Sequence, residues 1–186
     1  MNKTQFLKRF LKERKAIGAM MPSSKFLTKK MFDKVCFKEI RTIVELGPGT
    51  GVFTEEIISK MNKNTRFLVI ELDDVFHELL YEKIKHPNVE IVKASATKLR
   101  ELLADRNIES VDLIISSLPL ANFSSSLKLL ILLSCKNSLT KTSGQFVQFQ
   151  YTPQLHRLFK RVFTSVVLDF TLLNVPPAFV YSCRNN

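Results

Sequence analysis

The residues best suited to chemistry lie in a glycine-rich turn, E-L-G-P-G-T-G over residues 45–51, that follows an apolar segment and precedes a helical one. The three alternating glycines tolerate positive φ and carry no Cβ, so a ligand can approach their backbone closely. Glu45 stands two residues before the first glycine, where a carboxylate repels a pyrophosphate but attracts a ligand that carries positive charge. The turn therefore predicts a site for a nucleotide-like cation, and its spacing differs from the G-x-G-x-x-G of dinucleotide sites.

A second acid, Glu71, ends another apolar run about twenty residues after the turn. In nucleotide-binding βαβ units, an acid at this distance accepts hydrogen bonds from ribose hydroxyls. The two signals together predict a ligand that has both a ribose and a positive charge. The alternative is a glycine-rich turn that holds no ligand.

Strand and helix patterns alternate around this turn, which predicts an α/β, Rossmann-like fold with a seven-stranded, mostly parallel sheet and helices on both faces. Ligands in such sheets bind at the carboxyl ends of the strands, where we expect the turn, Glu71, Ser95 and Ser117. The expected strands are 42–46, 66–71, 89–93, 111–116, 144–150, 163–170 and 177–183, and the expected helices are 4–15, 24–35, 52–61, 73–85, 98–105, 124–138 and 153–160.

The net charge of +11 is concentrated at the N-terminus, because residues 1–30 hold nine Lys or Arg and one acid. Over residues 4–15, helical spacing gathers phenylalanine and leucine on one face and lysine and arginine on the other. This pattern is typical of a helix in an anionic membrane interface, so we predict that residues 1–15 contact an anionic membrane surface. Packing on the protein's own domain is an open alternative. Contact with nucleic-acid phosphates is less favoured, because few aromatic residues are interleaved with the charges.

Three cysteines, Cys36, Cys135 and Cys183, are far apart and form no C-x-x-C. We interpret them as reduced core residues of a cytosolic protein, and we predict no metal site. No signal peptide is expected. The longest apolar stretch, 127–133, is too short to span a bilayer.

Together, the glycine turn and the I-E-L-D segment at 70–73 resemble the class I S-adenosylmethionine-dependent methyltransferases, whose ligand has a sulfonium, an ammonium and a ribose. The resemblance implies that the turn lies beneath the methionine part of the cofactor, that Glu71 binds both ribose hydroxyls, and that S-adenosyl-L-homocysteine is the product. The cofactor-binding residues that it implies are Glu45, Gly47, Pro48, Gly49, Thr50, Gly51, Glu71, Leu72, Ser95, Ala96, Ser116 and Ser117.

Three further segments are more specific: G-A-M-M-P-S-S at 18–24, S-L-P-L at 117–120 and N-V-P-P-A at 174–178. In this order they resemble the short bacterial phospholipid N-methyltransferases, which convert phosphatidylethanolamine stepwise to phosphatidylcholine. The resemblance covers nearly the whole chain. It implies N-terminal amphipathic and cap helices at 1–35 and a methyltransferase domain at 36–186, within one domain overall. It also implies methylation of a phospholipid or aminolipid headgroup, ornithine-type lipids included, by a cytoplasmic protein at the inner face of the plasma membrane.

The ribosomal-RNA adenine dimethyltransferases share E-L-G-x-G-x-G but carry N-L-P-Y or a close variant, whose aromatic residue stacks on the base. Here Ser117 and Leu120 replace the asparagine and the aromatic, which favours an aliphatic amine over a nucleobase. We also expect no additional helical domain after Asn186. Ser95 stands where an acid is usual, and serine bonds an adenine amino group less strongly than a carboxylate does. RNA methylation and an inactive cofactor-binding relative therefore stay open as alternatives.

Methylation of an amine requires its neutral form, and a lipid ammonium has a pKa near ~10, so the site must remove a proton. Tyr151, just after the fifth expected strand, is the first candidate for orienting the amine or relaying its proton. His156 and Ser117 are the other candidate catalytic residues, and an ordinary structural role is the alternative for each. The candidate substrate contacts are Ser23, Ser24, Lys25, Leu118, Pro119, Tyr151 and Arg157.

Overall fold

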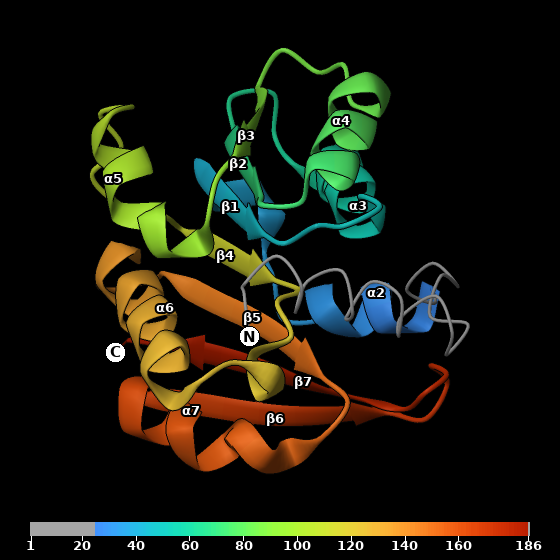
Figure 1. Ribbon diagram of the computed structural model, residues 1–186, viewed down its shortest axis with the longest axis vertical. Helices are drawn as coiled ribbons and strands as arrows, with labels where there is room; N and C mark the ends of the chain where they lie inside the picture. Colours follow the sequence, from blue (N-terminus) through green and yellow to red (C-terminus); the bar gives the residue numbers. More distant parts are fainter. Residues whose placement is uncertain (1–24, 186) are drawn as a thin grey trace.

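The computed structural model describes residues 25–185, in which seven strands form one sheet in the order β3-β2-β1-β4-β5-β7-β6 (Figure 1). β7 runs antiparallel to both of its neighbours, β5 and β6, and all other neighbouring strands are parallel. The expected seven-stranded, mostly parallel sheet is therefore confirmed. The strands are β1 Thr42–Leu46, β2 Arg66–Glu71, β3 Val89–Lys93, β4 Leu113–Ser116, β5 Gln145–Gln150, β6 Ser165–Thr171 and β7 Ala178–Arg184.

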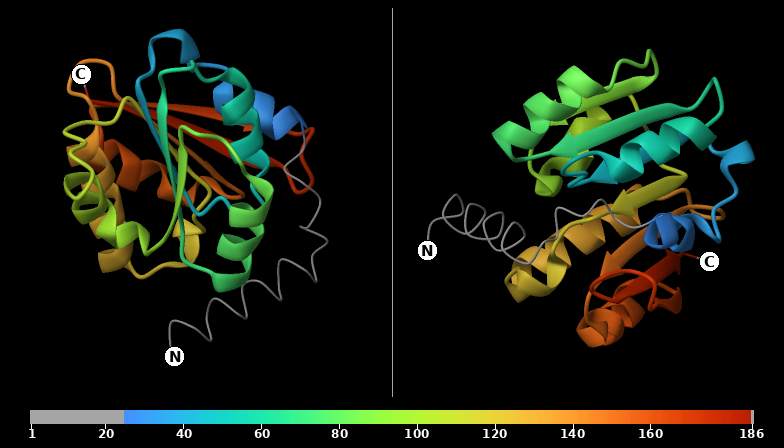
Figure 2. Two further views of the ribbon diagram at one scale, coloured as in Figure 1. Left: turned by 90° about the horizontal axis from the view of Figure 1, so that it is seen from above. Right: turned by 90° about the vertical axis from the view of Figure 1, so that its right-hand side faces the viewer.

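Helices cover both faces of the sheet, and each face has its own apolar core. Buried side chains of α2, α3 and α4 meet one face, while those of α5, α6 and α7 meet the other. Seen from above, the two sets of helices lie on opposite sides of the strands (Figure 2). The helices are α2 Lys25–Phe32, α3 Val52–Lys60, α4 Asp74–Lys83, α5 Leu99–Ala104, α6 Ser125–Ser138 and α7 His156–Val162.

The central strands β1 and β2 are buried over nearly their whole length because helices cover them on both sides. Apolar side chains are expected in such buried strands, but β1 also contains Glu45 and β2 ends at Glu71. Both acids are buried, with 0% and 7% of their surface exposed. Folding alone does not favour a buried carboxyl group, so these two residues point to a ligand site.

Several expected boundaries shift. Pro153 opens a 3-10 turn over Pro153–Leu155, and α7 then continues to Val162. The helix expected over 24–35 ends at Phe32, and the fourth strand begins at Leu113 rather than at residue 111. Cys36 is exposed, which corrects its assignment to the core, whereas Cys135 and Cys183 are buried. The helix expected over 4–15 lies outside the described residues. Within 25–185, no helix has the length and apolar character needed to cross a bilayer.

Candidate active site

The glycine turn takes a backbone shape that L side chains rarely adopt, because φ is +66° at Gly47, +60° at Gly49 and +83° at Gly51. Gly47 also has a packing reason to lack a side chain, since a Cβ there would lie 2.7 Å from Cδ2 of Leu118. The Gly47 amide donates to the carbonyl of Ile70 over 2.9 Å, which ties the turn to the end of β2. The turn is therefore held against the neighbouring strand and loop.

The carboxylate of Glu71 links the glycine turn to the loop that follows β2. Oε2 accepts from the Gly49 amide at 3.0 Å, and Oε1 accepts from the amides of Leu72 and Asp73 at 2.7 and 2.9 Å. Burial raises the pKa of Glu71, and these three backbone donors oppose that rise. A carboxylate oxygen can accept two hydrogen bonds, so Oε2, which accepts from Gly49, can also accept one from a ligand hydroxyl.

Glu45 is the more unusual acid because only one of its oxygens has a partner. Oε2 accepts from the buried Thr54 hydroxyl of α3 at 2.7 Å. Oε1 is buried and has no hydrogen-bond partner among residues 25–185. Burial raises the pKa of Glu45 to about 8, the Thr54 hydroxyl opposes that rise, and the negative charge of Glu71 adds to it. A cation beside Oε1 would satisfy the orphaned acceptor and favour its ionised form.

The loops after β3 and β4 complete the edge. The Ser117 amide donates to the carbonyl of Leu46 at 2.9 Å, and the Ser116 hydroxyl accepts from the Leu118 amide at 3.4 Å. The Ser95 hydroxyl caps the turn at Ala96–Lys98, accepting from the amide and the hydroxyl of Thr97. Both acceptor positions of that hydroxyl are thus in use, so an adenine amino group would have to displace Thr97 to bind there.

Two glutamines at the end of β5, to which the sequence analysis assigned no role, fix the loop after β4. The carbonyl of Leu118 accepts from Nε2 of Gln148 at 3.1 Å and from Nε2 of Gln150 at 3.0 Å. Gln150 Oε1 accepts from the Ala121 amide at 3.3 Å. The available signal was the pattern Q-F-V-Q-F-Q, which places polar side chains in a strand that is buried throughout. The glutamines thus connect the glycine turn, through Leu118, to β5.

The candidate proton-relay residues lie on opposite faces of the sheet. Tyr151 is 42% exposed and its ring meets Phe149 edge-on at 5.7 Å, on the face covered by α2 and α3. The His156 ring lies 6.2 Å from that of Tyr181, on the face covered by α6 and α7. Tyr151 and His156 therefore do not form a single relay.

Three buried polar atoms that have no partner among residues 25–185 lie on the His156 side: Nδ1 of His156, the hydroxyl of Tyr181 and Oε1 of Gln148. The buried hydroxyls of Ser117 and Thr152 also have no partner among these residues. Gln148 and Tyr181 are register partners in adjacent strands, so their side chains share a face. Burial raises the pKa of Tyr181 to about 12, which keeps its hydroxyl neutral.

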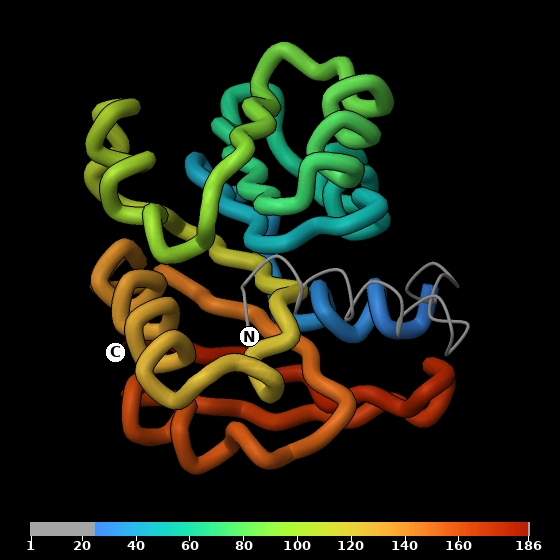
Figure 3. Tube along the Cα trace, viewed as in Figure 1, coloured from blue at the N-terminus to red at the C-terminus, as the bar shows by residue number. Residues whose placement is uncertain are grey.

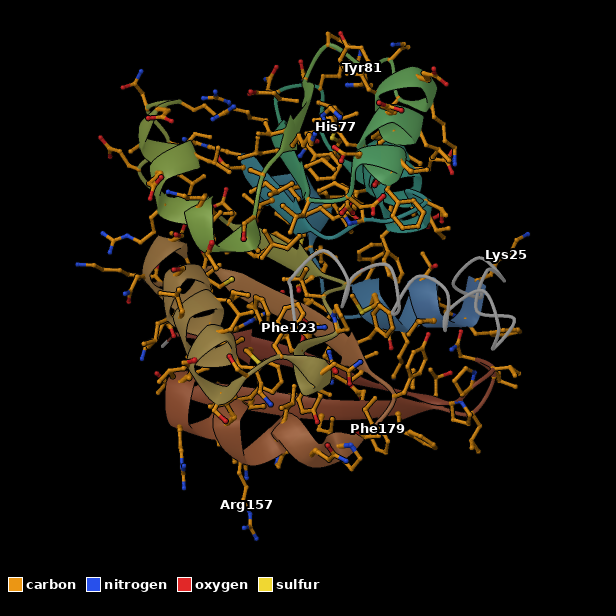
Figure 4. The ribbon with its side chains drawn as sticks, in the orientation of Figure 1. Lys25, His77, Tyr81, Phe123, Arg157 and Phe179 are labelled. Carbon is orange, nitrogen blue, oxygen red and sulfur yellow. The ribbon has the colours of Figure 1, made fainter. Side chains whose placement is uncertain are left out.

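The other candidate substrate residues are not gathered at one place. Lys25 is exposed at the start of α2, and Arg157 on α7 points away from the body of the molecule (Figure 4). Leu118 and Pro119 are partly buried in the loop over the glycine turn. Ser23 and Ser24 lie outside the described residues.

Comparison with known proteins gives three findings. Residues 3–141 match the family described as ribosomal RNA adenine dimethylase. An ornithine lipid N-methyltransferase of Singulisphaera acidiphila is 33% identical over 181 residues, which is 96% of this chain and 94% of that protein. A ribosomal RNA small subunit methyltransferase A of Mycoplasma capricolum is 30% identical over 106 residues, which is 56% of this chain but only 39% of that protein.

Solved structures agree with the fold. A precorrin-6y C5,15-methyltransferase from Geobacter metallireducens superposes with a TM-score of 0.68 at 14% identity, covering 87% of this chain and 89% of that one. At this identity the likeness concerns the fold. Together with the sequence matches, it makes S-adenosylmethionine the cofactor. The unpartnered Oε1 of Glu45, the glycine turn and Glu71 fit that molecule. The chain belongs to the ribosomal RNA adenine dimethylase family and is a class I S-adenosylmethionine-dependent methyltransferase.

Proposed function

We propose that this enzyme methylates the amine of an aminolipid headgroup, with an ornithine-type lipid as the first candidate and phosphatidylethanolamine as the second. The observation that carries the proposal is the 33% identity to an ornithine lipid N-methyltransferase over 96% of the chain. A local feature supports it: Leu120, at the position of the base-stacking aromatic in the RNA-directed relatives, is fully buried. A nucleobase would find no ring displayed at that position.

On the cofactor side, we assign Glu71 to the ribose hydroxyls and the turn at 47–51, with Pro48 and Thr50, to the methionine part. Leu72 is 51% exposed beside Glu71, so we assign it to the adenine as an apolar surface. The Ala94 amide donates to the Glu71 carbonyl at 3.0 Å, so Ser95 and Ala96 follow at the same end of β2 and β3 and are assigned to the adenine as well. Glu45 Oε1 is assigned to the positive charge of the ligand. When bound, S-adenosylmethionine supplies a methyl group made electrophilic by the sulfonium.

On the acceptor side, we assign the unpartnered polar atoms of Ser117, Gln148, His156 and Tyr181 to the amine. These groups are uncharged acceptors and donors in a buried setting, which disfavours the ammonium form of the substrate. His156 Nδ1 accepts the proton that the ammonium loses, and the nitrogen lone pair is then free to form the new N–C bond. Tyr151, exposed on the other face, is assigned to the lipid headgroup or its surroundings rather than to proton transfer.

The setting that we propose is the cytoplasmic face of the plasma membrane. Residues 1–35 would form the membrane-facing helices and 36–186 the methyltransferase domain. Supporting this is the placement of positive charge, since residues 1–30 carry nine of the 28 Lys and Arg.

The test is incubation of the full chain with S-adenosylmethionine carrying an isotopically labelled methyl group and one acceptor at a time. The acceptors are ornithine lipid, phosphatidylethanolamine and ribosomal RNA, each analysed by mass spectrometry. We expect label on a lipid nitrogen. Label on adenine of the RNA, with none on either lipid, would overturn the proposal.

The assignment of His156 has its own control. His156→Gln should lower kcat while cofactor affinity stays unchanged. The matched variant His77→Gln lies on α4, where His77 stacks on Tyr81 at 6.3 Å (Figure 4), and should change neither. If both variants keep the wild-type kcat, His156 is not the proton acceptor.

A further inference from the structure

The turn between β6 and β7, residues 172–177, displays apolar side chains and hides its one polar residue. Leu172, Leu173 and Val175 are 71%, 63% and 80% exposed. Asn174 is only 5% exposed, and its Nδ2 donates to the Pro176 carbonyl at 2.7 Å. A turn in water usually has the reverse arrangement, with polar side chains outside. Exposed apolar residues gathered at one tip indicate a binding surface.

This tip leaves the sheet at the same edge as the active site. β7 is antiparallel to both β5 and β6, so β6 runs in the same direction as β5 and ends at the carboxyl edge. The glycine turn and the Ser117 loop also lie at that edge. The Cα trace shows the hairpin running out past the strands on the side of α2 (Figure 3).

Positive charge flanks the apolar tip through α2. Asp169 on β6 forms ion pairs with Lys30 of α2, at 3.5 Å, and with Lys34 just after α2, at 2.5 Å, so α2 lies beside the hairpin. The first turns of α2 then present exposed Lys25 and Lys29, and Phe26 between them is 53% exposed. Figure 4 places Lys25 at the same end of the molecule as the hairpin tip.

We infer that the β6–β7 tip inserts into the boundary between headgroups and acyl chains of an anionic bilayer, with the lysines of α2 on lipid phosphates. Apolar side chains flanked by lysine suit this boundary, where the hydrophobic contact and the attraction to anionic lipid act together. This insertion turns the carboxyl edge of the sheet toward the headgroups, and it rests on the proposed lipid substrate. The partner is therefore a lipid surface. A tip that does not insert into vesicles would instead be available to a protein partner.

The absence of tryptophan from the sequence permits a direct test. Val175→Trp in the full chain introduces a single reporter at the tip, and Leu130→Trp introduces one on α6, at a leucine that is 51% exposed. Each variant is mixed with phosphatidylcholine vesicles that contain phosphatidylglycerol. We expect a blue shift and quenching by brominated acyl chains for Val175→Trp alone. A Val175→Trp protein that floats with the vesicles but keeps its unshifted, unquenched emission would overturn the inference.

A second pair of variants measures the contribution to binding. Leu172→Asp/Val175→Asp should lower vesicle partitioning about 100-fold, because two apolar side chains no longer leave water. Leu130→Asp is the control and should partition like the wild type. Equal partitioning of all three proteins would contradict insertion of the tip. Methylation of a short-chain, monomeric aminolipid separates the two proposals. If this lipid is methylated but the tip does not insert into vesicles, only the insertion is wrong. If no aminolipid is methylated, the proposed function is wrong.

Discussion

The buried carboxyl group of Glu45 leads to a prediction about protons rather than about rate. With a pKa of about 8, Glu45 is about nine-tenths protonated at pH 7 in the ligand-free protein. A unit positive charge placed about 4 Å from Oε1 contributes ~4 kcal/mol at an effective dielectric constant of ~20, which lowers a pKa by ~3 units. Binding of a cationic cofactor at this oxygen should therefore release about 0.9 proton at pH 7.

Isothermal titration calorimetry measures this release. S-adenosyl-L-homocysteine, which keeps the ammonium group, is titrated into the protein in buffers of different ionisation enthalpy. The observed binding enthalpy should vary with the buffer, and affinity should rise with pH and level off above a pH of about 8. In Glu45→Gln, we expect both the buffer dependence and the rise of affinity with pH to disappear.

Two further variants sharpen the assignment. Thr54→Val removes the hydroxyl that donates to Oε2, so the pKa of Glu45 should rise further and the levelling of affinity should move to higher pH. Glu55→Gln, at the next residue of α3 and exposed, should leave the proton release unchanged. Proton release that persists in Glu45→Gln would refute the reasoning and place the titrating group elsewhere.

Three more predictions concern the stability of the fold and the glycine turn. The free energy of unfolding of the ligand-free protein should fall by up to about 5 kcal/mol as pH rises from about 4.5 to about 8, because the folded state holds the Glu45 proton that the unfolded state has lost. Urea titrations at several pH values measure this fall, and Glu45→Gln should flatten it. Gly47→Ala should weaken cofactor binding more than tenfold in calorimetry and cost about 1–2 kcal/mol of stability, since φ is +66° and the new Cβ meets Leu118; adding Leu118→Ala should recover only part of the loss. Asp169→Asn should lower the free energy of unfolding by about 1 kcal/mol or less, measured by thermal melting, because its partner Lys34 is half exposed. A larger loss in the variant would be inconsistent with a surface ion pair.

The sequence predicted the first three strands to the residue. Thr42–Leu46, Arg66–Glu71 and Val89–Lys93 are continuous runs whose neighbours are turn-forming residues, and the glycine turn and Glu71 are local signals. Such features need only a short window of sequence. The edge on which they meet follows from the parallel topology.

The acceptor side was less predictable because it depends on contacts between distant residues. Gln148 faces Tyr181 only because β7 inserts antiparallel between β5 and β6, and no local pattern specifies that pairing. The same non-local geometry separates Tyr151 from His156 and buries Asn174 inside an apolar turn. The expectations for these residues rested on their positions along the chain, which do not show on which face of the sheet a side chain lies.

The strand order separates the part of the sheet that carries the glycine turn from the part in which we propose the acceptor site. The family match ends at residue 141, just before β5, and so covers the half that carries the glycine turn and Glu71. The remaining 45 residues of the chain include the glutamines of β5, His156 at the start of α7, Tyr181 of β7 and the apolar tip between β6 and β7. Because Gln148 and Gln150 of β5 hold the Leu118 carbonyl beside Gly47, we expect substitutions at these two glutamines to disturb the glycine turn, whereas the β6–β7 tip can change without altering the cofactor site.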